Sequence, residues 1–123
     1  MTPVTHFVID RNIWLRGDGG YESYLLRSSD GKQCCLGIYL EACGISRGRL
    51  NNSCDPSCLV DEWSDVPDWM SEIYAGTLAK RRQAEAVNAL IKANDDESLT
   101  QDELERQIAC GFAKQGITVD FIN

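Results

Sequence analysis

The sequence predicts an α+β fold in which a small sheet contains the N- and C-terminal strands and packs against about three main helices. Apolar and polar residues alternate near both ends of the chain, which is the period of a half-buried strand. Three segments between the ends carry apolar residues at helical spacing. A length of 123 residues supports one core, so residues 1–123 are predicted to form a single domain.

The first strand is predicted within residues 5–14. Phe7 and Ile9 alternate there with His6 and Val8, so the two pairs should face opposite sides of a sheet. Residues 21–27 predict a second short strand, because the turn-forming sequence SSDGK follows directly.

The first main helix is predicted over residues 33–43, with one stripe of its surface buried. Cys34 stands at the start of this helix, one step off the stripe, and Gly44 is placed to end it in a left-handed conformation. The residues of the predicted stripe are Cys35, Leu36, Tyr39, Leu40 and Cys43.

The middle of the chain gives weaker signals. Turn formers dominate residues 45–60, which are predicted to form a long irregular loop. After Pro67, a short helix is expected to carry Trp69, Ile73 and Tyr74.

The C-terminal third predicts two helices and a strand. Residues 80–94 are amphipathic, and Thr100 with Glu103 forms the capping-box pattern of a second helix. Ile117, Val119 and Phe121 alternate with polar residues and predict the last strand. The buried positions expected in the two helices are Ala84, Val87, Leu90, Ile91, Leu104, Ile108 and Phe112.

The net charge of −7 is unevenly distributed along the chain. Residues 1–60 contain six basic and six acidic side chains, whereas residues 61–123 contain six basic and thirteen acidic ones. Such a surface repels nucleic acid and suits a basic partner protein, including one that itself binds nucleic acid. A solubilising surface is the alternative interpretation.

The start of the chain lacks the basic and apolar segments of a signal peptide, and no apolar run is long enough to span a membrane. We therefore expect a cytoplasmic protein with no membrane association and with reduced cysteines.

Several short motifs occur in a characteristic order. They are WLRG at 14–17, DGK at 30–32, CCLG at 34–37, ND at 94–95 and GITVDF at 116–121. In this combination the chain resembles a family of short hypothetical proteins encoded by phages and prophages. The resemblance implies a phage accessory role and supplies neither a reaction nor a ligand. Small phage accessory proteins often block host defence systems, redirect host enzymes or sequester signalling nucleotides.

A thiol hydrolase is one alternative function. A cysteine in the first turn of a helix can be stabilised as a thiolate, so Cys34 or Cys35 could act as nucleophile. His6, the only histidine, would be the base, and Asp10 or Asp120 could orient it. Alternatively, the cysteines are apolar core residues.

A zinc-stabilised interaction module is a second alternative. Cys54 and Cys58 have CxxxC spacing, and Cys34, Cys35 or Cys43 would have to complete four ligands. Neighbouring helical residues point about 100° apart, which makes such a set difficult to assemble. No cofactor is therefore predicted.

A small-ligand site is a third alternative. Trp14 and Arg16, followed by Gly17, Gly19 and Gly20, could hold a phosphate or a base of a small nucleotide. Otherwise Trp14 belongs to the core and Arg16 pairs with a carboxylate.

The favoured hypothesis is a non-enzymatic protein that binds and inhibits a host component, for example by anti-CRISPR-like action or nucleotide sequestration. Aromatic residues surrounded by acidic ones are suited to anchor a basic partner protein. The residues predicted to bind it are Asp61, Glu62, Trp63, Asp65, Asp68, Trp69, Asp95, Asp96 and Glu97. Alternatively, the tryptophans are core residues and the acidic side chains are simply solvated, and for Trp69 the core is the favoured interpretation.

Overall fold

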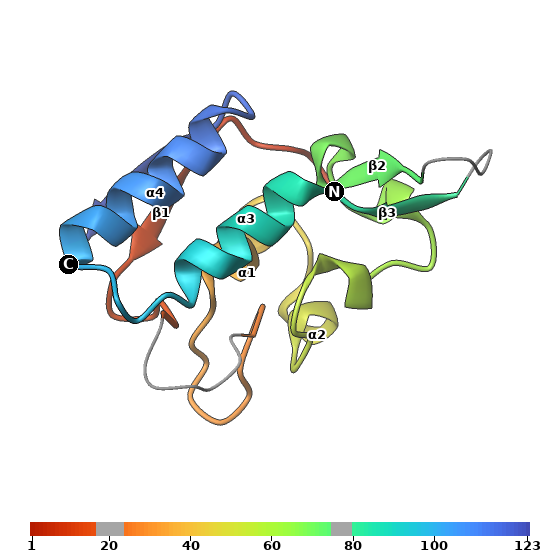
Figure 1. Cartoon of the computed structure of the whole chain (residues 1–123). Helices are drawn as coiled ribbons and strands as arrows, with labels where there is room; N and C mark the ends of the chain where they lie inside the picture. The colour runs from red at the N-terminus through yellow and green to blue at the C-terminus, as the bar shows by residue number, and fades with distance from the viewer. Residues whose placement is uncertain (17–23, 75–79) are drawn as a thin grey trace.

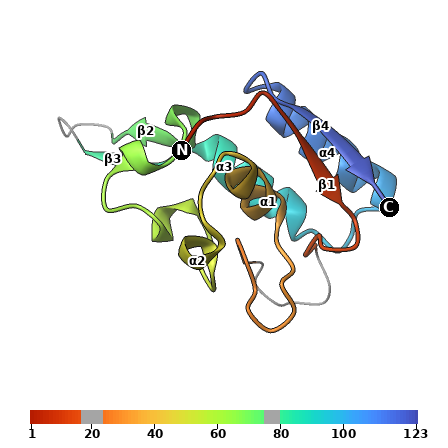
Figure 2. The same ribbon diagram turned by 180° about the vertical axis from the view of Figure 1, so that it is seen from behind.

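The computed structural model describes residues 1–16, 24–74 and 80–123 and confirms the α+β fold. Figures 1 and 2 show the helices and strands from opposite sides. The helices are α1 (Cys35–Ala42), α2 (Arg47–Leu50), α3 (Glu85–Asn94) and α4 (Gln101–Ala113). The strands are β1 (His6–Asp10), β2 (Ser71–Ile73), β3 (Arg81–Gln83) and β4 (Thr118–Ile122). Short 3-10 turns occupy Pro56–Cys58, Trp63–Asp65 and Asp68–Met70.

The two ends of the chain form one parallel two-stranded sheet, as the alternating residues predict. His6 of β1 pairs with Thr118 of β4, and the register continues to Asp10 and Ile122. Phe7 and Ile9 are buried, whereas the residues that alternate with them are more exposed. One face of this sheet therefore belongs to the core.

The core forms where α1 and α4 meet the inner face of the sheet. The ring of Phe7 lies 5.2 Å from that of Tyr39 and 4.9 Å from that of Phe112. Figure 2 shows β1 and β4 lying side by side along α4. Because α3 packs against both α1 and α4, three main helices enclose the core.

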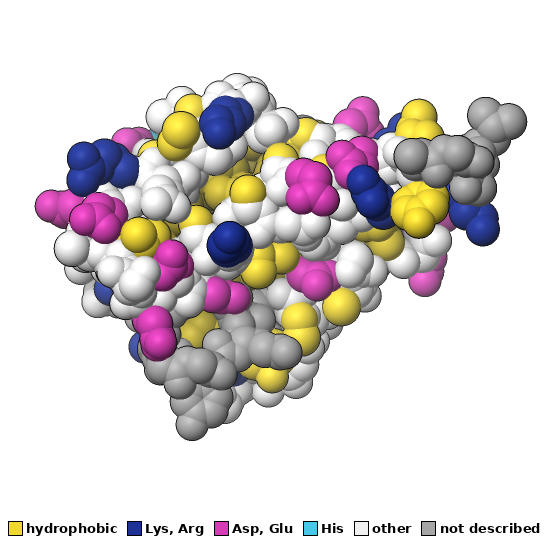
Figure 3. Space-filling model, viewed as in Figure 1, with side chains coloured by type: hydrophobic (Ala, Val, Ile, Leu, Met, Phe, Trp, Pro, Cys, Tyr) yellow, Lys and Arg dark blue, Asp and Glu magenta, His cyan; other side chains and the backbone are white. Residues whose placement is uncertain are grey.

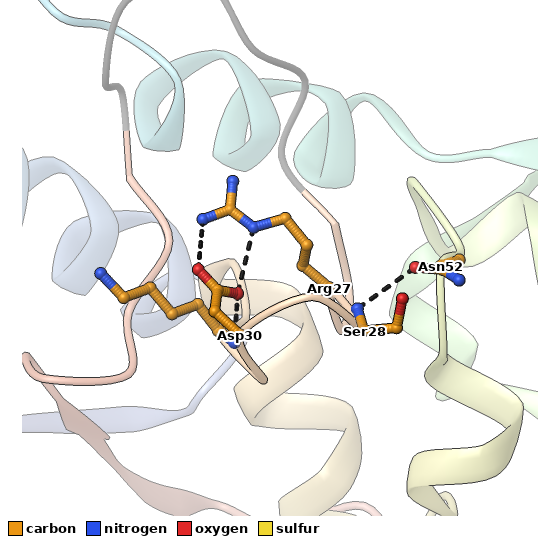
Figure 4. Close-up of polar contacts among 5 residues, drawn as sticks. Arg27, Ser28, Asp30 and Asn52 are labelled. Carbon is orange, nitrogen blue, oxygen red and sulfur yellow. Dashed lines mark hydrogen bonds and ion pairs between the residues drawn. The ribbon is translucent and has the colours of Figure 1, made fainter.

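A turn over residues 27–32 leads into α1. Arg27 forms two hydrogen bonds with the Asp30 carboxylate, which also accepts the Lys32 backbone N–H (Figure 4). The Ser28 backbone N–H donates to the Asn52 side chain, 3.2 Å away, which connects this turn to the segment after α2. The DGK sequence thus forms the predicted turn.

Both ends of α1 are determined by nearby residues. At its end, Gly44 has φ +100° and its N–H donates to the Glu41 carbonyl, as predicted. At its start, Cys34 supplies no side-chain cap. Instead, Asn94 Oδ1 accepts the Cys35 N–H at 3.1 Å across the core. The first turn of α1 therefore depends on α3.

Four segments differ from the predictions. Residues 45–60 contain α2, because the Ser46 side chain accepts the Arg49 N–H and caps a short helical turn. In the described part of the predicted strand at 21–27, Leu26 forms only an isolated bridge with Asn51.

The helix expected after Pro67 is the third difference. Only the 3-10 turn Asp68–Met70 follows Pro67, and it ends at Met70. Ser71–Ile73 then pair with Arg81–Gln83 as strands β2 and β3. Strand β3 is the fourth difference, because Arg81–Gln83 lie in the segment predicted to be helical over residues 80–94, whereas α3 begins only at Glu85. Within the described residues, no helix has the length and apolar composition that crossing a membrane requires.

Candidate functional site

The candidate site is an acidic hollow of about 490 Å³ beside Trp63. Two 3-10 turns build most of it, and Val66 and Met70 anchor these turns in the core with 1% and 0% of their surface exposed. Arg81 of β3 completes the wall. The lining residues are Asp61, Glu62, Trp63, Ser64, Asp68 and Arg81.

Trp63 is fixed in this wall by its own polar group. Its indole Nε1 donates to the Arg81 carbonyl at 3.1 Å, and its ring packs partly against the core. Because the N–H is already bonded within the protein, the ring surface is what Trp63 offers to a ligand. An aromatic ring next to carboxylates favours a cation.

The charges around the hollow are unbalanced. Within the described residues, the carboxylates of Asp61, Glu62 and Asp68 form no ion pair. Arg81 is the one basic residue of the lining, and its Nη1 donates to Ser71 Oγ at 3.0 Å. The lining therefore carries three negative charges and one positive charge, which suits a basic ligand.

Two other residues of the predicted partner-binding set lie outside the lining. Asp65 is directed toward Arg49, with 3.7 Å between Oδ2 and Nη2. Trp69 is half-buried and packs against the core, where its ring lies 5.8 Å from that of Tyr39 and 6.0 Å from that of Phe112. Trp69 therefore stabilises the fold, in line with its interpretation as a core residue, and it does not line the hollow.

The second acidic segment lies at the other end of α3. The 3-10 turn that contains Asp68 contacts the start of α3, because the Met70 carbonyl accepts the Ala84 N–H. Asp95 lies at the opposite end of α3, where it caps the helix. Asp96 accepts hydrogen bonds from the hydroxyl and N–H of Ser98, and these bonds lower its carboxyl pKa. Glu97 is exposed. On the face that carries α3 and α4, acidic side chains are interspersed with basic ones (Figure 3). The two acidic segments therefore do not merge into one hollow.

The thiol candidates are buried. Cys34 and Cys35 are 2% and 0% exposed, and loss of solvation raises the pKa of Cys34 to about 12 and that of Cys35 well above its ordinary value. The expected burial of Cys35 is confirmed. Cys34 was predicted to lie one step off the buried stripe of the helix, but it is as buried as the residues of that stripe. Both thiols are therefore protonated at neutral pH.

His6 is directed away from these cysteines. It lies on the exposed face of the sheet, where its Nε2 is 2.6 Å from Asp120 Oδ2. Phe7, its neighbour in β1, points to the opposite face and contacts Tyr39 of α1. The structure therefore does not bring His6 and the cysteines of α1 together as a catalytic pair.

Trp14 is a core residue rather than an exposed ligand platform. It is 3% exposed, and its Nε1 donates to Asn94 Oδ1 at 2.8 Å. Arg16 covers its ring at 4.9 Å, and the buried Arg16 Nη1 has no hydrogen-bond partner among the residues that the structure describes. The glycines predicted to complete this site, Gly17, Gly19 and Gly20, lie outside the described residues.

The zinc hypothesis finds little support in the described part of the chain. Cys54 is half-buried and Cys58 is exposed. Within residues 1–16, 24–74 and 80–123, no three His, Cys, Asp or Glu side chains are grouped so that they could hold a metal. The CxxxC pair therefore lacks a third ligand in these ranges.

Ser64 and Arg81 are the lining residues that sequence reasoning missed. The pattern over residues 80–94 predicts a helix that includes Arg81, so it gives no indication that Arg81 lines a hollow. Residues 80–83 are all polar and contain no apolar residue that a helix could bury against the core, which is a signal against a helix there.

Comparisons of the chain with protein-family models, characterised proteins and solved structures gave no match.

Proposed function

We propose that this chain is a non-enzymatic phage accessory protein that binds and inhibits a bacterial host protein with a basic surface. The acidic hollow beside Trp63 is the observation that carries the proposal. A component of anti-phage defence is the class of target that the resemblance to phage proteins favours. Many such targets bind nucleic acid and present basic surfaces, which an acidic inhibitor can occupy.

The hollow has the chemistry for such a role. Three carboxylates that form no ion pair with any described residue attract a basic side chain, and the ring of Trp63 adds an apolar wall against which it can lie. Exposed carboxylates mainly accelerate association and select partners, so binding should weaken strongly with salt. The excess of acidic residues after position 60 extends this attraction beyond the hollow.

A hydrolase has less support. The two thiols at the start of α1 are enclosed, and His6 lies on the opposite face of the sheet. The geometry therefore favours recognition over catalysis by the predicted residues.

The test is a comparative pull-down from bacterial lysate. The tagged wild-type chain is compared with Asp61→Asn/Asp68→Asn and with Glu97→Gln/Asp102→Asn, each of which removes two negative charges. We expect a specific protein partner that is recovered by the wild type and the second variant but lost with the first. The partner should also be released between 0.15 M and 0.5 M salt, where screening becomes stronger.

The alternative outcomes are informative. Equal loss with both double variants would show that only net charge matters and would contradict a role for the hollow. Retention of the partner by Asp61→Asn/Asp68→Asn would place the binding surface elsewhere. A wild type that recovers no protein from lysates of several bacterial hosts would contradict the proposal as a whole.

A further inference from the structure

Strands β2 and β3 form a short hairpin that projects from the body of the protein beside the turns that build the hollow (Figures 1 and 2). Its strands β2 and β3 are antiparallel, and Ile73 lies directly opposite Arg81. Arg81 also lines the hollow. The hairpin and the hollow therefore share a residue.

The two faces of the hairpin have different surroundings. Side chains of paired residues lie on the same face, so Ile73 lies on the face of Arg81. On the opposite face, Arg82 pairs with Glu72 and covers the ring of Tyr74 at 5.4 Å. The apolar residue on the face of Arg81 is thus Ile73 and not Tyr74.

Ile73 is unusually exposed for a large aliphatic residue. Its exposure is 66%, the highest among the large hydrophobic residues of the described ranges. Figure 3 shows hydrophobic surface on the hairpin. A single exposed apolar residue is ordinary on a protein surface. Ile73 differs from such a residue because it lies directly opposite Arg81, which lines the acidic hollow.

We propose that Ile73 and the hollow form one recognition site for an extended segment of the partner protein. The segment places an arginine in the hollow and a large apolar side chain on Ile73. This inference rests on the proposed function and specifies which feature of the partner is bound.

The spacing of the site sets the spacing in the partner. Directly opposed side chains in an antiparallel pair have Cβ atoms about 4.5–5.5 Å apart, so the Cβ of Ile73 lies about that far from the Cβ of Arg81. In an extended chain, residues i and i+2 point to the same side and lie about 6.6 Å apart. An arginine and a leucine separated by one residue therefore fit the hollow and Ile73 together.

Arginine fits this hollow better than lysine. A planar guanidinium can stack on the ring of Trp63 while its N–H groups donate to the carboxylates of Asp61, Glu62 or Asp68. A lysine ammonium makes a compact point contact and cannot do both as well. We therefore expect the site to prefer arginine.

The experiment is an NMR titration of the full isotope-labelled chain with the capped peptide GLSRSLG. This peptide presents a leucine on either side of the arginine, so both chain directions are covered. Three comparison peptides replace both leucines by glycine, the arginine by citrulline, or the arginine by lysine. The protein variants are Ile73→Ser, Asp61→Asn/Asp68→Asn and, as matched control on the opposite hairpin face, Tyr74→Ser.

We expect GLSRSLG to bind with a Kd of about 1 mM and to shift resonances of Trp63 and Ile73. Citrulline, or the double variant of the hollow, should weaken binding about tenfold. Replacing both leucines should weaken it about fivefold, and Ile73→Ser should weaken it as much but have no effect on the leucine-free peptide. Tyr74→Ser should leave the affinity unchanged.

Different results refute different claims. If citrulline weakens binding but neither the leucines nor Ile73→Ser matter, the hollow stands and the recognition site that includes Ile73 is refuted. If no peptide binds, or citrulline binds as well as arginine, the inference and the hollow of the proposed function both fail. If sedimentation shows a dimer of the free chain that Ile73→Ser dissociates, a second copy occupies the site and the inference is refuted.

Discussion

Replacing Gly37 by alanine tests how α1 is seated in the core. Gly37 lies in the middle of α1, and a Cβ added to it would meet the Leu25 backbone, with 1.9 Å to the carbonyl oxygen and 2.6 Å to its carbon. Carbon atoms in contact normally lie about 3.5–4.0 Å apart, so Gly37→Ala must displace one chain segment by more than about 1 Å. The glycine is required here for close approach of two backbones.

The expected cost follows from how firmly the Leu25 segment is held. The Leu25 N–H donates to the Ser53 carbonyl at 2.7 Å, and the neighbouring Tyr24 carbonyl accepts the Cys34 N–H at 2.8 Å. Overpacking costs about 1–3 kcal/mol, and each strained hydrogen bond adds about 1 kcal/mol. Alanine recovers about 1 kcal/mol through its higher helix propensity. We therefore expect Gly37→Ala to lower the free energy of unfolding by about 3 kcal/mol.

Urea unfolding followed by far-UV circular dichroism measures this change. For a slope of about 1.5 kcal/mol per M, the midpoint should fall by about 2 M. Gly48→Ala is the matched control, because its added Cβ meets nothing within 4 Å and the residue also lies in a helix. We expect Gly48→Ala to be neutral or stabilising by up to about 1 kcal/mol. A midpoint for Gly37→Ala equal to that of Gly48→Ala would refute the close-approach argument.

Three further predictions concern other parts of the fold. Asn94→Ala should lower the free energy of unfolding by about 3 kcal/mol or more, because it leaves buried partners in Trp14 and at the start of α1 without hydrogen bonds. Iodoacetamide at pH 7.5 should alkylate the exposed Cys110 but not the buried Cys34, as mass spectrometry of the folded protein would show. Asp30 should stabilise the fold above about pH 4 and lose this contribution as the pH falls to about 2, because hydrogen bonds from the Arg27 side chain and the Lys32 N–H lower its carboxyl pKa to about 2. Thermal unfolding of the wild type and Asp30→Asn across this range should therefore show a difference that disappears in acid.

Each of these has an outcome that contradicts it. Asn88→Ala, at an exposed position of α3, should change stability little, and an equal loss there would deny Asn94 its special role. Rapid alkylation of Cys34 in the folded protein would restore the thiol-hydrolase hypothesis. A difference between wild type and Asp30→Asn that persists at pH 2 would show that the carboxylate charge is not its cause.

The local signals in the sequence were sufficient for the regular elements near the ends of the chain. Thr100 and Glu103 form the capping box that begins α4, and Gly44 adopts the left-handed conformation that ends α1. The alternating residues of β1 and β4 were also sufficient to assign their buried faces. In each case the signal lies within a few residues of the feature that it determines.

The candidate site was predictable only in part. Asp61, Glu62, Trp63 and Asp68 line the hollow as the acidic and aromatic pattern suggested, whereas Trp69 has similar neighbours in sequence and packs against Phe112 without lining the hollow. Which tryptophan lines the hollow depends on how the two 3-10 turns rest on the core. Local composition cannot distinguish these two cases.

The sequence by itself determined the α+β class, the main helices, and the two terminal strands with their buried sides, because caps and periodicity are local properties of the chain. Only the tertiary structure decided that Asn94 bonds to Trp14 and Cys35, that Gly37 meets the Leu25 backbone, and that Arg81 joins the acidic hollow. These contacts join residues far apart in the chain. Their partners are chosen by packing and by the requirement that buried polar groups be bonded, and neither is visible in a local pattern.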